Sequence, residues 1–183
     1  MIKFLTAVIL IFVALLERIF FDLGPNVELV TMALVLSSFY LGNKYSSFVV
    51  LVILIISDLI IGNSSIFIFT WTGFLLPALF VHKFLSKGNS IKNIFSGTLA
   101  GVSTNLFFFL WTNLGVWLLS AMYPNTAQGL MMSYLNGLLF LKLQLLSTLL
   151  FVPLGFTLFE TFKLLSKTVL KEYRFKSGAV PQL

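Results

Sequence analysis

The sequence contains no cysteine, a single histidine and few charged residues, since Asp, Glu, Lys and Arg together make up 10% of its 183 residues. Without cysteine there are no disulfides, thiolate metal sites or cysteine nucleophile. His82 alone cannot form a multi-histidine site. We find no H-E-x-x-H, no G-x-S-x-G and no glycine-rich phosphate loop. We therefore expect no enzymatic activity, no metal or other cofactor, and no ATP hydrolysis by this chain.

Apolar residues dominate what is present. Hydrophobic residues make up 58% of the chain, and the mean hydropathy is +1.02. A soluble domain of this size cannot hide so much apolar surface. The composition predicts an all-α integral membrane protein with a single transmembrane domain, 1–183, in the cell (inner or plasma) membrane. The net charge of +6 is assigned to contact with the lipid bilayer rather than with nucleic acid.

Six apolar runs are candidates for transmembrane helices, each near the length that a bilayer requires. They cover residues 4–21, 27–42, 46–61, 66–81, 94–119 and 138–165, followed by a basic tail, 166–183. Gly24-Pro25-Asn26 breaks the chain after the first run, and Gly62-Asn63 ends the third. The last two runs exceed the bilayer thickness, so they are expected to tilt or protrude. Gly97-x-x-x-Gly101 is typical of close helix packing.

The basic residues predict the orientation. With both termini in the cytoplasm, ten of the twelve Lys and Arg residues lie on the cytoplasmic side, and only Arg18 and Lys142 lie outside. The first run could instead be a signal peptide. However, Glu17-Arg18 follows it directly and no cleavage site of small residues is present, which favours a retained span.

Asp58 is the most informative polar residue, because Ser57-Asp58 interrupts an otherwise apolar run. An unpaired carboxylate inside a membrane costs about 3 kcal/mol or more. Two interpretations remain open. Asp58 forms part of a functional site, or it pairs with Arg18 or Lys142 and only locks helices together.

The other intramembrane polar groups also gather in the outer half of the predicted bundle, which predicts an outward-facing cavity. Asn113 and Trp117, four residues apart, share one face of a helix. The predicted substrate-binding residues are Asn26, Asp58, Trp71, Asn113, Trp117, Tyr123, Tyr134 and Lys142, with Gly24-Pro25-Asn26 as a lid. Each has a structural alternative: Trp117 and Tyr123 suit an interfacial aromatic belt, and Asn113 suits a hydrogen bond between helices.

Three segments carry a resemblance to a known family. They are residues 57–62 (SDLIIG), 107–117 (FFFLWTNLGVW) and 122–130 (MYPNTAQGL), followed by Tyr134 and Phe140 and preceded by Pro25-Asn26. Together they resemble an uncharacterised family of small bacterial membrane proteins. That family is grouped with the substrate-binding (S) components of energy-coupling-factor (ECF) vitamin transporters.

The resemblance implies a six-helix, S-component-like bundle that takes up a small molecule with the help of a transmembrane coupling subunit and ATPases. The aromatic and amide groups favour a ring-bearing polar metabolite over a bare metal ion. One feature departs from the pattern, because S components often carry Ala-x-x-x-Ala on the first helix, whereas Ala7 and Ala14 are seven residues apart. The alternatives are a membrane scaffold that holds a partner and a small stand-alone permease.

Overall fold

The computed structural model describes residues 2–21, 23–24, 26–62 and 65–176, with side chains up to residue 165. Within this part of the chain there are helices and no strands. The elements are α1 (Ile2–Leu16), η1 (a π-helical turn, Glu17–Phe21), α2 (Val30–Tyr40), α3 (Asn43–Ile61), α4 (Phe67–Phe80), η2 (a 3₁₀ turn, Val81–Phe84), α5 (Ser90–Leu119) and α6 (Ala127–Lys176). The predicted all-α bundle of six helices is confirmed.

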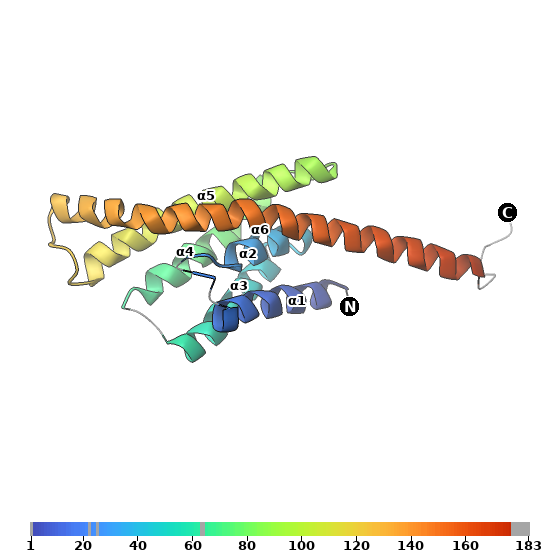
Figure 1. Cartoon of the computed structure of the whole chain (residues 1–183), viewed down its shortest axis with the longest axis horizontal. Coiled ribbons are helices and arrows are strands. Elements are labelled where there is room, and N and C mark those ends of the chain that lie inside the picture. The colour runs from blue at the N-terminus through green and yellow to red at the C-terminus, as the bar shows by residue number, and fades with distance from the viewer. Residues whose placement is uncertain (1, 22, 25, 63–64, 177–183) are drawn as a thin grey trace.

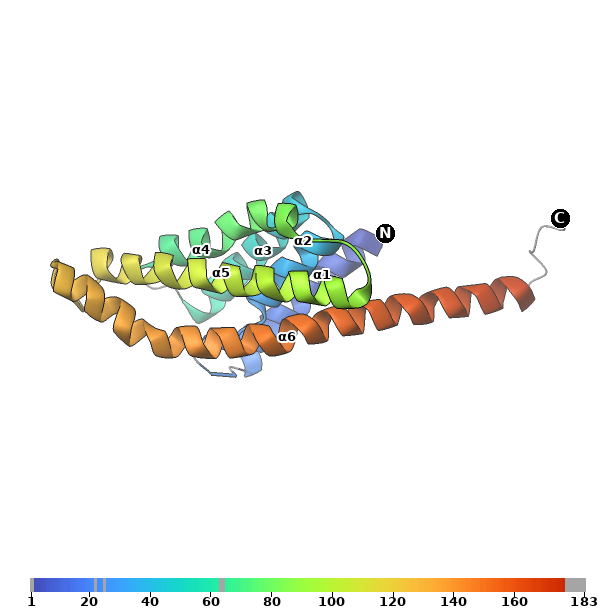
Figure 2. The same ribbon diagram turned by 90° about the horizontal axis from the view of Figure 1, so that it is seen from above.

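α2 is the centre of the bundle. All of residues 30–39 are buried, and α2 packs against each of the other five helices. Figure 2 shows it enclosed by its neighbours. The helices that surround α2 expose large apolar side chains, as expected of a surface that faces lipid. Within the described part of the chain, five helical stretches are long and apolar enough to cross a membrane, and α2 is a shorter apolar helix.

The second span is shorter than the predicted 27–42. Its 11 helical residues rise by about 16 Å, roughly half the hydrocarbon thickness. The helix begins late because Gly24 and Asn26 both have positive φ, of 121° and 59°. Glycine and asparagine tolerate this left-handed backbone, and Val27 N donates to the Gly24 carbonyl at 3.0 Å in a turn. The chain therefore reaches α2 through an irregular segment that ends at Leu29.

α6 begins eleven residues before the predicted start at 138, and it continues through the predicted basic tail as far as Lys176. Its N-terminal part packs along α5 (Figure 1). A Cβ on Gly97 would overlap the Phe156 ring, and one on Gly101 would lie 2.7 Å from Thr148 Cγ2. The Gly-x-x-x-Gly motif thus lets α5 approach α6 closely. Beyond the bundle, α6 protrudes alone (Figure 1).

α1 and α3 run parallel. Near their starts, the Lys3 ammonium lies 5.9 Å from the centre of the Tyr45 ring. At the opposite end, Arg18 in η1 contacts Ser57 and Asp58 in the last turns of α3. The start of α1 and the protruding part of α6 point to the same end of the bundle (Figure 1). The α1–α3 pair therefore carries Lys3 and Tyr45 at one end and the ion pair of Arg18 and Asp58 at the other.

Candidate functional site

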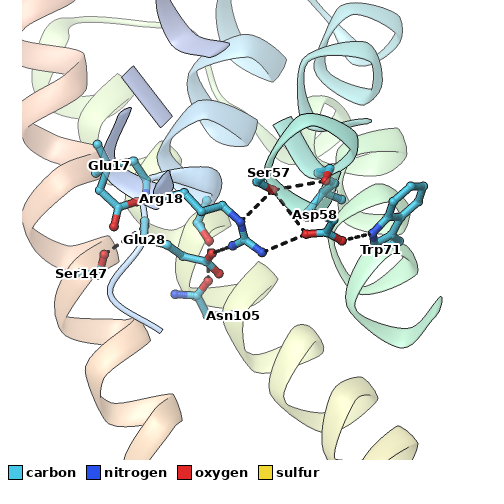
Figure 3. A network of polar contacts seen from close by, with 11 residues as sticks. Glu17, Arg18, Glu28, Ser57, Asp58, Trp71, Asn105 and Ser147 are labelled. Atoms are coloured by element: carbon cyan, nitrogen blue, oxygen red, sulfur yellow. Dashed lines mark hydrogen bonds and ion pairs between the residues drawn. The ribbon is translucent and has the colours of Figure 1, made fainter. Parts of the chain in front are cut away.

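Polar side chains from four segments, three of them charged, meet where α1 and α3 end and α4 begins. We call Arg18, Glu28, Ser57, Asp58 and Trp71 the Arg18 cluster (Figure 3). Arg18 comes from the π-helical turn η1, and Glu28 comes from the irregular segment before α2. A π turn adds a residue to a helix and often occurs at functional positions. Here it places Arg18 between the α2 and α3 sides of the bundle.

The Arg18 guanidinium uses all three of its nitrogens. Nη1 forms an ion pair with Glu28, Nε donates to Ser57 Oγ at 3.0 Å, and Nη2 lies 3.6 Å from Asp58 Oδ1. The pair with Glu28 is therefore the tighter of the two. One cation faces two carboxylates from different elements, and the side chains of Arg18 and Asp58 are only 20% and 9% exposed. Their attraction is weakly screened at this burial.

Trp71 completes the cluster from the α4 side. Its indole Nε1 donates to Asp58 Oδ2 at 2.6 Å. Asp58 thus accepts from an aromatic ring with one oxygen and faces Arg18 with the other. Trp71 also meets Phe67 edge-on, with ring centres 6.2 Å apart. A charged group therefore sits beside a large aromatic surface.

Side chains also satisfy the irregular backbone that leads into α2. Leu29 N, at the start of α2, donates to Glu17 Oε2 at 3.0 Å. A carboxylate is favourable there because helix N-termini carry partial positive charge. Ser147 of α6 donates to the Glu28 carbonyl at 3.1 Å. Non-helical backbone at membrane depth requires such partners or water, so this segment is held to both η1 and α6.

A second, uncharged group lies in the middle of the bundle and reaches α2 at Thr31, three residues after Glu28; Figure 3 labels its member Asn105. We call Thr31, Asn105, Gln144 and Thr148 the Asn105 cluster. Thr31 donates to Asn105 Oδ1 at 2.9 Å. Asn105 Nδ2 donates to the Gln144 carbonyl at 3.0 Å and to Thr148 Oγ1 at 2.6 Å. All four residues are at most 2% exposed, and Gln144 Nε2 has no hydrogen-bond partner among the described residues.

Four of the predicted site residues, Asn113, Trp117, Tyr123 and Tyr134, form a third group, the α5–α6 seam. Asn113 donates to Phe109 O in its own helix at 2.8 Å, and Trp117 donates to Pro124 O at 3.1 Å. Tyr134 of α6 donates to Leu110 O at 3.0 Å, while Asn136 donates to the Tyr123 hydroxyl at 3.0 Å. These bonds join α5, the loop after it and the start of α6.

The structure does not bring all the predicted residues to one pocket. Asp58 and Trp71 meet, and Asn26 lies two residues before Glu28 in the same irregular segment. Asn113 lies against Gly137 of α6 instead of facing Asp58. The reason is helix phase, since Asn105 and Asn113 are eight residues, or about 80°, apart around α5. Asn105 is the residue of α5 that approaches the Arg18 cluster. The proposed lid includes Pro25, which lies outside the described residues.

Lys142 does not pair with Asp58. Its side chain is exposed, and no ion pair among the described residues includes it. Lys142 lies two residues, or about 200° around α6, from the buried Gln144. It therefore points away from the helix face that meets the Arg18 cluster. Arg18 is the cation that the structure places beside Asp58.

The sequence predicts Arg18 only as a pairing partner, and the predicted binding residues do not include Glu28, Ser57 or Asn105. Glu28 could have been found from the sequence, because it is a carboxylate two residues after the helix-breaking segment Gly24-Pro25-Asn26. For Asn105, the signal was an amide in a long apolar run, eight residues before the amide that was chosen.

These features define an integral membrane bundle with a buried polar centre. The chain belongs to a family of unknown function, DUF6580, whose model matches residues 1–171. Neither the curated proteins nor the solved structures include a match to this chain.

Proposed function

We propose that the protein is a substrate-binding membrane protein similar to the S components of ECF transporters, and that its binding site is the Arg18 cluster. The observation that carries this proposal is the arrangement around Arg18, where one cation faces two carboxylates at the end of irregular backbone. Ionisable groups inside membrane proteins most often serve binding or transport. Broken helices at membrane depth are also common at substrate sites.

The arrangement favours a small polar metabolite with a ring. Asp58 lies farther from Arg18 than an ideal hydrogen bond allows, at 3.6 Å. A donor group on a ligand can therefore take Asp58 while Arg18 keeps Glu28 and Ser57. The indole of Trp71 provides a flat surface for a ring beside the same carboxylate. Partner subunits, a coupling protein and ATPases, would supply the energy for uptake.

The proposal is tested with protein purified in mild detergent. Small molecules released from the wild type and from Asp58→Asn are compared by mass spectrometry. We expect one metabolite that is enriched with the wild type and reduced about tenfold or more with Asp58→Asn, since a buried charged hydrogen bond contributes about 1.5–3 kcal/mol. Lys142→Gln, which alters an exposed charge, should retain the metabolite. Equal amounts in all three samples would contradict the proposal.

The proposed orientation has both termini and the loop before α5 in the cytoplasm, because the basic residues collect there. The cysteine-free chain allows a direct test. Single cysteines at Ser90 and Gln128, both exposed, are probed with an impermeant thiol reagent in intact cells. We expect labelling at position 128 and protection at position 90. The reverse pattern would overturn the orientation.

A membrane scaffold is the second candidate, and the shape of α6 favours it. The 50-residue helix rises by about 75 Å, more than twice the hydrocarbon thickness. Its part beyond the bundle is exposed at Phe162, Leu164 and Leu165. A scaffold would hold a partner there, and its function would survive Asp58→Asn.

A further inference from the structure

An open groove lies between α1 and α3 at the end opposite the Arg18 cluster. Its volume is about 1000 Å³. Eight residues line it, from residues 3–11 of α1 and residues 44–48 of α3: Lys3, Phe4, Ala7, Val8, Ile11, Lys44, Tyr45 and Phe48. No function proposed above uses this groove.

The groove has a basic end and an apolar body. Lys3 and Lys44 lie in the first turns of two parallel helices, so both ammonium groups stand at its mouth. Deeper in, Val8 and Ile11 from α1 face Phe48 from α3, and Ala7 is buried between the helices. From Phe4 to Ile11 the apolar wall extends for about 10 Å along α1.

The positive charge at the mouth has no counter-ion among the described residues. No carboxylate lines the groove, and neither lysine forms an ion pair within the described part of the chain. The carboxylates of the Arg18 cluster lie at the other end of the same two helices. An anion at this mouth would therefore meet two ammonium groups, with no carboxylate among the lining residues to compete for them.

We propose that this groove binds an anionic phospholipid of the surrounding membrane. The two lysines hold the phosphate, and one acyl chain lies along Phe4, Val8 and Phe48. The open side of the groove suits an occupant that arrives from the bilayer, and lysines at the end of a span reach the headgroup level. Basic pockets between transmembrane helices are a known form of site for anionic headgroups.

The test uses the full-length protein in nanodiscs made of equal parts phosphatidylglycerol and phosphatidylcholine. Lipids that remain bound after release from the nanodisc are counted by native mass spectrometry. The ratio of retained phosphatidylglycerol to phosphatidylcholine is compared between wild type and the double variant Lys3→Gln/Lys44→Gln. We expect the ratio to fall by roughly tenfold or more, because each lysine near an anionic headgroup contributes about fivefold.

The matched control is Lys83→Gln/Lys92→Gln, which removes the same charge from exposed lysines outside the groove. It should keep the wild-type ratio. A third variant, Val8→Phe, narrows the apolar body and should lower retention of both lipids while leaving the lysines in place.

Three results would overturn the proposal: no preference for phosphatidylglycerol in the wild type, a ratio unchanged in Lys3→Gln/Lys44→Gln, or an equal fall in both double variants. Either of the first two results would mean that the groove does not select an anionic lipid and is better suited to a partner helix. An equal fall in both double variants would show an effect of net charge alone. The binding site for a metabolite is untouched by these variants, so either proposal can fail without the other.

Discussion

The Arg18 cluster and the α5–α6 seam satisfy their polar groups in opposite ways. In the Arg18 cluster, side chains bond to side chains from other segments. Arg18, for example, bonds to Glu28, 10 residues away in the sequence, and to Ser57, 39 residues away. In the seam, side chains mostly bond to backbone carbonyls, and Asn113 bonds within its own helix. An amide can satisfy itself locally, whereas a charge in a membrane needs a partner of opposite sign. The charges therefore determine how the helices are assembled.

This contrast predicts that Arg18→Met destabilises the protein more than any other single substitution considered below. The substitution leaves Glu28 and Asp58 facing each other without a cation, and breaking a buried pair in this way costs about 3–5 kcal/mol. We expect a marked fall in the yield of monodisperse protein and in its thermal midpoint in detergent, measured by fluorescence-detected size-exclusion chromatography.

Lys142→Met is the control, because it removes a cation whose side chain is exposed. Its midpoint should stay close to that of the wild type. A second variant, Arg18→Lys, keeps the charge but not the forked geometry, and it should recover part of the loss. If Arg18→Met is as stable as the wild type, the cluster does not hold the helices together.

The sequence predicts the helices of this chain better than it predicts which of their faces meet. Long apolar runs and the glycines between them are local signals, and they placed the breaks near Gly24 and Gly62 correctly. The start of α6 was missed because Pro124, Gly129 and Asn136 suggest a loop. In the structure, contacts with α5 and its loop, such as that of Tyr134, hold this stretch as helix.

The candidate site was also predicted only in part, because the sequence indicates how deep a residue lies but not the direction in which it points. The depth of a residue follows from its position in a span, which is why Asp58 and Trp71 were both placed near the same end of the bundle. The direction in which it points depends on how the helix is rotated, and packing with the neighbouring helices sets that rotation. Gly97 and Gly101 turn one face of α5 toward α6, and that rotation brings Asn105, and not Asn113, against Thr31 of α2.

Asn105 and Asn113 of α5 give the sharpest test of the contrast. Asn105→Leu removes three hydrogen bonds between helices and leaves the Thr31 hydroxyl without its acceptor. We expect a loss of about 1–3 kcal/mol. Asn113→Leu removes only a bond within α5, so we expect a loss below about 0.6 kcal/mol. Unfolding of both variants in mixed detergent micelles, followed by circular dichroism, gives the two values.

Steric effects must be separated from the loss of the amide, because Asn113 lies against Gly137. Asn113→Ala loses the same hydrogen bond but adds no branched side chain, so it is the variant that isolates the polar term. A loss for Asn113→Ala as large as that for Asn105→Ala would show that the seam relies on its polar groups as much as the bundle centre does. The distinction between the two regions would then disappear. A small loss for Asn113→Ala, with a large one for Asn105→Ala, would place the structurally required amide of α5 beside the Arg18 cluster.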